Sequence, residues 1–310
     1  MQYTMLEGII PIVFLPFDPQ GNIDEAGLRK IVRFELEGGV DGIGVNGFAG
    51  EAYKLTDDER RRTVEVVAGE VSNAVPLVIG IAPGSTEAAI SQAREFARFR
   101  PAALMTLPPA TMELPPEALV RHYVALGQAL DTPVMVQQSP HIQGYSGTGL
   151  GSEALAEIAD RSPNVRYFKI EGPGAAQRIQ RLRPLLDTDR VNLFGGGGGI
   201  TLPDELHAGS SGLIPGVGFN EYFCRAWPLW RSGQRAAALR LLDHIQPLVS
   251  AVSGPGHEFS LHARKYLMQR AGYICSRHVR QPTVGVDPVT LSRLDGIVES
   301  LDLRISRKAG

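Results

Sequence analysis

Short apolar runs alternate along the chain with longer segments in which apolar residues recur every three or four positions. The short runs predict β-strands, and the longer segments predict amphipathic helices. The predicted strands cover residues 8–17, 42–46, 75–82, 102–107, 132–137, 165–171, 191–194 and 211–215. Helices are expected over residues 24–38, 85–98, 115–130, 152–160 and 175–186, with others opening at residue 56 and passing through Trp227 and Trp230. Asp24 and Ser152 are expected to cap their helices, and Thr56 to form a capping box.

This succession of strand and helix units predicts the architecture. Eight units within about 230 residues match the length and rhythm of a (β/α)8 TIM barrel. A doubly wound sheet is the alternative, but no Gly-x-Gly-x-x-Gly follows the first predicted strand. Further helical patterns cover residues 235–252, 257–269 and 288–303. We therefore expect a barrel over residues 1–232 and a C-terminal helical extension, residues 233–310, packed on it.

Composition narrows the class of protein. With 310 residues, 43% of them hydrophobic, the chain can bury a large core. Its formal net charge of -2 gives no bias towards nucleic acid or an anionic membrane surface. No apolar run is long enough to span a membrane, and the amino terminus lacks a basic signal-peptide region, so a cytoplasmic protein is expected. Two cysteines and scattered histidines give no metal-ligand spacing, so we expect no catalytic metal.

The sixth predicted strand contains a candidate catalytic residue. Lys169 lies near the end of an apolar stretch, residues 164–171, and is one of only five lysines among 31 basic residues. An unpaired ammonium is costly to bury, whereas a neutral lysine amine can attack a carbonyl, which arginine cannot. Two interpretations of Lys169 follow. It is a structural lysine at a strand end, whose ammonium reaches solvent or pairs with a carboxylate, or it is a reactive amine.

Glu171 follows two residues later. Side chains two positions apart share one face of a strand, so its carboxylate is expected beside the Lys169 amine. The two residues form either a plain ion pair or a Schiff-base lysine with a general base next to it. In a TIM barrel they would face the mouth formed by the carboxyl ends of the strands.

Four motifs, spread along the chain, match the pattern of one protein family when they are taken together. They are the opening Gly8-Ile9-Ile10-Pro11, the turn Gly47-Phe48-Ala49-Gly50-Glu51, the strand that carries Lys169, and the glycine-rich segment 209–216. Together they resemble the dihydrodipicolinate synthase / N-acetylneuraminate lyase family of class I aldolase-type barrels over nearly the whole chain. The resemblance implies the barrel fold and a Schiff base formed through Lys169.

The departures from the family pattern concern proton transfer. The family usually has Tyr-Asn-x-Pro after the fifth strand, but this chain has Gln137-Gln138-Ser139-Pro140, and an amide cannot relay protons. The two threonines of the usual turn are Phe48 and Ala49, and an expected aromatic is Ala110. These departures argue against the synthase and sialic acid lyase reactions. They resemble the subgroup of L-2-keto-3-deoxyarabonate dehydratases, in which the glutamate at the position of Glu171 replaces the tyrosine as acid and base.

The resemblance implies a site and a reaction. Lys169 and Glu171 would be catalytic in the dehydration of a 2-keto-3-deoxy sugar acid, with no cofactor beyond the imine. Substrate contacts are expected from the following residues: Phe48 and Ala49 through their backbone amides, Gln137, Gln138, Gly195, Gly196 and Ile214. A pyruvate-releasing aldolase and a non-catalytic keto-acid-binding barrel are the alternatives. A homo-oligomer, dimer or tetramer, is expected from the family.

Overall fold

The computed structural model describes residues 5–81, 84–109, 114–142, 144–145 and 149–306. They form two compact units, one made of Met1–Gly8 and Pro76–Ile214 and the other of Ile9–Val75 and Pro215–Gly310. The short strand β1 (Gly8–Ile9) contains the boundary between them.

The first unit is built on parallel strands. Strands β3 to β7 lie in chain order within one sheet, and each pairs in parallel with the next. Their bounds are β3 (Leu77–Ile81), β4 (Ala103–Thr106), β5 (Val134–Gln138), β6 (Val165–Ile170) and β7 (Asn192–Phe194). Strand β8 (Gly212–Leu213) continues this order, because Leu213 forms a parallel bridge with Gly195 just after β7.

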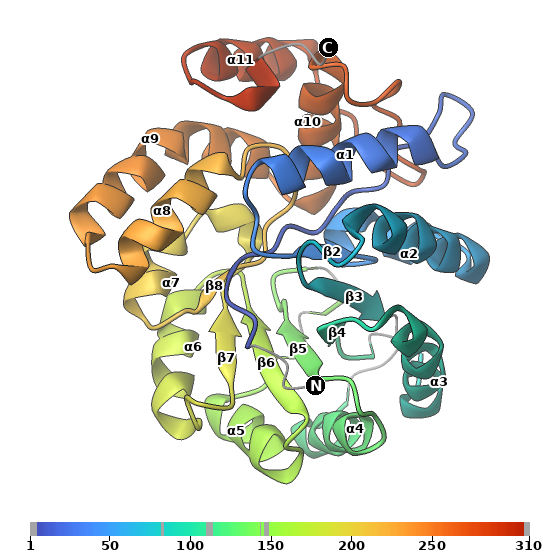
Figure 1. Ribbon diagram of the computed structural model, residues 1–310, viewed down its shortest axis with the longest axis vertical. Helices are drawn as coiled ribbons and strands as arrows, with labels where there is room; N and C mark the ends of the chain where they lie inside the picture. The colour runs from blue at the N-terminus through green and yellow to red at the C-terminus, as the bar shows by residue number, and fades with distance from the viewer. Residues whose placement is uncertain (1–4, 82–83, 110–113, 143, 146–148, 307–310) are drawn as a thin grey trace. The chain divides into compact units, whose positions relative to one another are not determined.

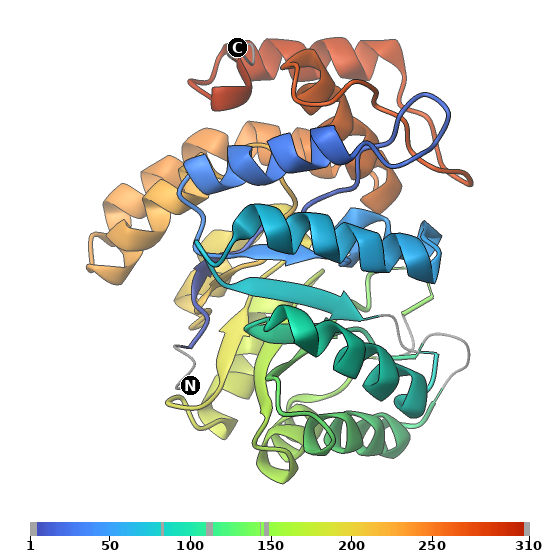
Figure 2. The same ribbon diagram turned by 45° about the vertical axis from the view of Figure 1, so that its right-hand side comes forward.

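A helix follows each of the strands β3 to β7 along the chain. They are α3 (Thr86–Phe96), α4 (Pro116–Gln128), α5 (Ser152–Arg161), α6 (Ala175–Leu182) and α7 (Leu202–His207). Each packs against the next from α3 to α7, outside the strands (Figures 1 and 2). Strands covered in this way read as continuous apolar runs, and every residue of β3 to β5 is buried.

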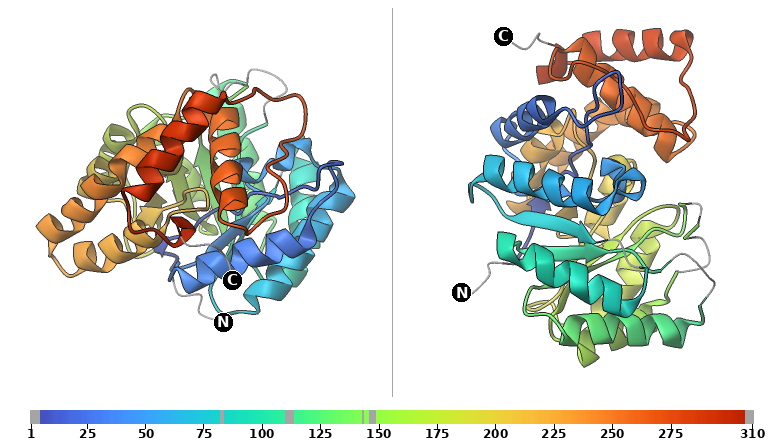
Figure 3. Two further views of the ribbon diagram at one scale, coloured as in Figure 1. Left: turned by 90° about the horizontal axis from the view of Figure 1, so that it is seen from above. Right: turned by 90° about the vertical axis from the view of Figure 1, so that its right-hand side faces the viewer.

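The second unit combines the two ends of the chain. Its strand β2 (Ile43–Val45) lies near Ile12, which forms parallel bridges with Gly44 and Gly216. Its helices are α1 (Glu25–Glu37), α2 (Asp57–Val71), α8 (Glu221–Arg231), α9 (Arg235–Ser253), α10 (His257–Arg270) and α11 (Pro288–Glu299). Helix α1 packs on α2, α8 on α9, and α9 on both α10 and α11. Figure 3 shows the orange and red helices α10 and α11 beside one another.

Helix starts agree with the predicted caps in two cases and differ in a third. Asp24 accepts a hydrogen bond from Gly27 N at 2.8 Å, and Thr56 forms the expected capping box with Glu59. The prediction for Ser152 was wrong: Gly151 is the N-cap, and Ser152 is the first helical residue. Glycine is itself a tolerated N-cap, which explains why the helix starts without a capping side chain.

The first strand is much shorter than predicted. Only Gly8–Ile9 is a strand, while Ile12 and Phe17 form isolated bridges. Pro11 and Pro16 lack the N–H that a continuous ladder needs, which accounts for the interruption. Parallel strands alternating with helices fit the predicted TIM-barrel class. Among the described residues, no helix is both long and apolar enough to cross a membrane.

Candidate active site

Lys169 lies at the end of β6 and is 6% exposed. It is in register with Gln137 of β5 on one side and Phe194 of β7 on the other. Residues in register on parallel strands present their side chains to the same face, so the three side chains share one face of the sheet. The Lys169 Nζ atom lies 3.3 Å from Glu171 Oε2, as the strand alternation predicted.

The Glu171 carboxylate is held by three donors from two segments. Gln137 Nε2 donates to Oε1 at 2.7 Å, and the Ser139 hydroxyl donates to the same oxygen. Gly197 N donates to Oε2 at 3.0 Å. The residue is only 5% exposed, so this carboxylate is fixed in direction and largely removed from water.

Burial by itself would raise the pKa of Glu171. The neighbouring Lys169 ammonium, the Ser139 hydroxyl and the Gly197 N–H outweigh that effect and lower the pKa of Glu171 to about 2. Glu171 is therefore a carboxylate at neutral pH, the form in which it can accept a proton.

Gly196 leaves room for this carboxylate. A Cβ atom built at residue 196 would overlap the Oε2 atom of Glu171, so any larger residue would displace the Glu171 side chain. A Cβ atom at Gly195 would overlap Oε2 of another glutamate, Glu205 of α7. Substrate contacts are predicted at both glycines, and the structure shows that each already accommodates a carboxyl group.

Comparison with known proteins identifies the family. The model of the dihydrodipicolinate synthetase family matches residues 5–301. The chain is 30% identical over 305 residues to an L-2-keto-3-deoxyarabonate dehydratase from Azospirillum brasilense, covering 97% of this chain and 96% of that one. The chain belongs to the dihydrodipicolinate synthetase family. A 4-hydroxy-tetrahydrodipicolinate synthase from Methanopyrus kandleri is also 30% identical, over 251 residues, with 80% of this chain and 81% of that one covered.

Solved structures of other proteins share the fold. Dihydrodipicolinate synthase from Rhodopseudomonas palustris superimposes with a TM-score of 0.86 and 23% identity, covering 96% of this chain and 98% of that one. CdNal from Clostridium difficile, solved with mannosamine, has a TM-score of 0.82 and 20% identity, covering 96% and 99%. At these identities the likeness concerns the fold.

The structure places two other predicted contact residues, Gln138 and Ile214, next to parts of the candidate site. Gln138 is in register with Ile170 rather than Lys169, and its Oε1 accepts from Leu150 N at 2.8 Å. It thus holds a loop, and its role in substrate binding stays a prediction. Ile214 N donates to Gly195 O at 3.0 Å, which places Ile214 beside the glycine segment.

Phe48 and Ala49 belong to the second unit, in a short 3-10 turn (Phe48–Gly50). The Phe48 ring stacks on Tyr53 with centroids 4.6 Å apart and contacts the His257 ring at 4.3 Å. Phe48 thus places a packed aromatic ring in this turn. A role of this turn in binding a carboxylate stays a prediction, and Ala110 lies outside the described residues.

Sequence reasoning missed three residues that contact the candidate site. Ser139 lies two residues after Gln137, so the alternation that connected Lys169 with Glu171 would have found it. Gly197 contributes only a backbone N–H, which no residue type reveals. Arg178 of α6 donates from Nη2 to Glu171 O at 2.5 Å, a contact that depends on how the following helix packs.

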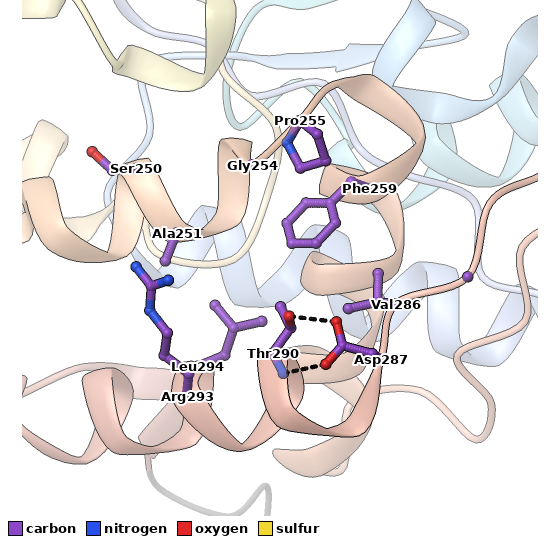
Figure 4. Close-up of a pocket in the computed structure, with 11 residues that line it drawn as sticks. Ser250, Ala251, Gly254, Pro255, Phe259, Val286, Asp287, Thr290, Arg293 and Leu294 are labelled. Carbon is purple, nitrogen blue, oxygen red and sulfur yellow. Dashed lines mark hydrogen bonds between the residues drawn. The ribbon is translucent and has the colours of Figure 1, made fainter.

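A pocket of about 440 Å³ lies elsewhere, among α9, α10 and α11 of the second unit (Figure 4). Phe259 and Leu294 contribute apolar surface, while Asp287 is occupied in bonding Thr290. None of the predicted site residues lines this pocket. Within the part of the chain that the structure describes, no group of three or more His, Cys, Asp or Glu could hold a metal ion.

Proposed function

We propose that this family member is a Schiff-base-forming lyase that dehydrates a 2-keto-3-deoxy sugar acid, of the type that gives 2-ketoglutarate semialdehyde from L-2-keto-3-deoxyarabonate. The observation that carries the proposal is the 3.3 Å approach of a buried carboxylate, Glu171, to Lys169 Nζ, with an amide, Gln137, beside them. The similarity to the Azospirillum brasilense dehydratase supports the same reaction.

The reaction begins with imine formation. The neutral Lys169 amine attacks the C2 ketone, and loss of water gives a protonated imine, which withdraws electrons from C3.

Glu171 then performs the proton transfers. Its carboxylate removes a proton from C3, and the electron pair moves towards the imine nitrogen to give an enamine. The carboxylic acid so formed donates this proton to the C4 hydroxyl, which leaves as water. Tautomerisation of the resulting C3–C4 alkene and C5 alcohol gives an aldehyde, and hydrolysis of the imine returns the Lys169 amine. The net change is the loss of one water molecule.

Substrate recognition in this proposal involves both predicted glutamines, the Phe48 and Ala49 turn, Gly195, Gly196 and Ile214. Gln137 is best supported among them, since its amide already contacts Glu171 and shares a face with Lys169. We further propose that the strands close into a (β/α)8 barrel over residues 1–232, with residues 233–310 as a helical extension. We expect a cytoplasmic homo-oligomer, a dimer or tetramer, which light scattering after size exclusion would measure.

Reductive trapping tests the function. Borohydride added with pyruvate, and separately with 2-keto-3-deoxyarabonate, should leave a mass adduct on the wild-type protein and none on Lys169→Ala. Lys30→Ala, which alters an exposed lysine of α1, is the matched control and should keep the adduct. Absence of an adduct from either compound would overturn the proposal and favour a keto-acid-binding barrel.

Product analysis separates the two lyase reactions. Incubation with 2-keto-3-deoxyarabonate should give the semialdehyde without pyruvate. Pyruvate detected by coupling to lactate dehydrogenase, together with a normal imine adduct, would instead assign an aldolase.

A further inference from the structure

A second buried carboxyl group lies behind the glycines of the candidate site. Glu205 of α7 is 1% exposed, and its Oε1 accepts from the Thr201 hydroxyl at 2.8 Å. Its Oε2 is buried and has no hydrogen-bond partner among the described residues. A fully buried, unpartnered carboxylate oxygen is costly, whereas a protonated carboxyl group avoids the charge.

This carboxyl group and Glu171 lie against consecutive residues of one backbone segment. Glu205 fills the space where a side chain at residue 195 would lie, and Glu171 fills the space at residue 196. Successive side-chain directions point to opposite faces of an extended backbone, so the two carboxyl groups lie on opposite sides of it. The next residue, Gly197, donates its N–H to Glu171 at 3.0 Å.

We propose that Glu205 is a positioning residue that works as a neutral carboxylic acid: it supports the Gly195–Gly197 segment from behind and adds no second negative charge next to Glu171. The proposal rests on the proposed function of Glu171 as acid and base. An ionised Glu205 would place a second negative charge close to the Glu171 carboxylate. Repulsion between the two would displace the glycine segment that holds Glu171, and this displacement would slow the reaction.

The charged groups around Glu205 come from three segments. Burial, the largest effect, raises the pKa of Glu205, and the charges of Glu171 and of Asp204 on α7 add to it. The Thr201 hydroxyl and the Arg178 guanidinium of α6 act in the opposite direction, and the resulting pKa is about 7. Ionisation of Glu205 therefore falls within the range in which the activity can be measured.

The pH profile of kcat/KM is the first test. The wild-type kcat/KM should fall above pH 7, to about one-tenth of its maximum at pH 8, because a group of pKa 7 is then about one-tenth protonated. Glu205→Gln should keep most of its own maximal kcat/KM at pH 8, so the retained fraction should be about tenfold larger than in the wild type. Glu205→Gln should keep near wild-type activity at pH 6, since the amide fills the same space without charge. Glu205→Ala, which removes that support, should lose activity at every pH.

A stability measurement tests the same inference without catalysis. The pKa of Glu205 in the folded protein lies above the ordinary value of 4.5, so the contribution of this group to stability is full below pH 4.5 and is lost as the pH rises through 7. The melting temperature of the wild type should therefore fall relative to that of Glu205→Gln across this range. Glu153→Gln, which alters an exposed carboxylate of α5 that does not act on Glu205, is the matched control and should follow the wild type in both measurements.

Parallel pH profiles for wild type and Glu205→Gln, in activity or in melting temperature, would overturn the inference. If borohydride trapping fails but the melting temperatures of wild type and Glu205→Gln diverge with pH as expected, the proposed function is overturned. The conclusion that Glu205 is a neutral carboxylic acid would then still hold. The two failures are thus distinguishable.

Discussion

At the residue scale, the neighbours of Glu171 fix the orientation of its carboxylate and keep it ionised. Gln137, Ser139 and Gly197 donate to it, and Lys169 lies 3.3 Å away. We expect Glu171→Gln to lower kcat by roughly 10²- to 10⁴-fold, because an amide cannot accept a proton from carbon. The borohydride adduct with pyruvate should persist, since the Lys169 nucleophile is intact. Steady-state kinetics and intact-protein mass would measure both effects.

A matched control for this variant is Glu153→Gln, which alters an exposed carboxylate of α5 in the same unit. It should change neither kcat nor adduct formation. Wild-type turnover by Glu171→Gln would show that another group moves the proton.

The second prediction at this scale concerns Gly196. In Gly196→Ala the new Cβ would collide with Glu171, so the carboxylate must move. Displacement of a catalytic group by about 1 Å can cost on the order of 100-fold, and we expect a loss of this order in kcat/KM. Gly69→Ala in α2, where a Cβ meets nothing within 4 Å, should leave activity unchanged and raise stability by up to about 1 kcal/mol.

At the element scale, the start of α2 depends on its capping box. Thr56 Oγ1 accepts from Glu59 N at 3.2 Å, and Glu59 Oε2 accepts from Thr56 N at 2.9 Å. Thr56→Ala should lower the free energy of unfolding by about 1 kcal/mol. Urea denaturation should report a lower midpoint with an unchanged slope. Thr56→Ser keeps a hydroxyl acceptor, and an equal loss in that variant would rule out the cap as the cause.

The same elements show how far the sequence could predict the structure. Explicit caps at Asp24 and Thr56 located two helix starts, and strand alternation brought Lys169 and Glu171 together. The first strand was overestimated because apolar composition alone does not register the hydrogen bonds that Pro11 and Pro16 cannot donate. The position of Glu205 against Gly195 was beyond prediction, since it depends on how α7 packs behind β7.

At the scale of the whole chain, several ion pairs connect the two ends of the sequence within the second unit, and one of them is fully buried. Lys265 of α10 bonds to Glu51, and both side chains are fully buried. Lys265 also donates to His278 O at 2.8 Å and lies 4.5 Å from the centre of the Phe17 ring. Burial lowers the pKa of Lys265, and the negative charge of Glu51 partly restores it, to about 8.

Removing one partner of this pair should be costly. Lys265→Met leaves the buried carboxylate of Glu51 without its main cation, and we expect a loss of about 3–5 kcal/mol in the free energy of unfolding. The double variant Lys265→Met with Glu51→Gln should recover part of that loss. Chemical denaturation of the two variants measures the difference, and equal losses would show that the pairing itself is not what matters.

The glycines that accommodate Glu171 and Glu205 also have a consequence for the evolution of the sequence. Because each carboxyl group occupies the volume of a side chain that its glycine lacks, positions 195 and 205 cannot vary independently, nor can 196 and 171. Relatives with a bulky residue at the position of Gly195 are expected to have a smaller or differently directed residue at that of Glu205. Correlated substitution at these two pairs would therefore distinguish, from sequence alone, the relatives that share this arrangement of carboxyl groups.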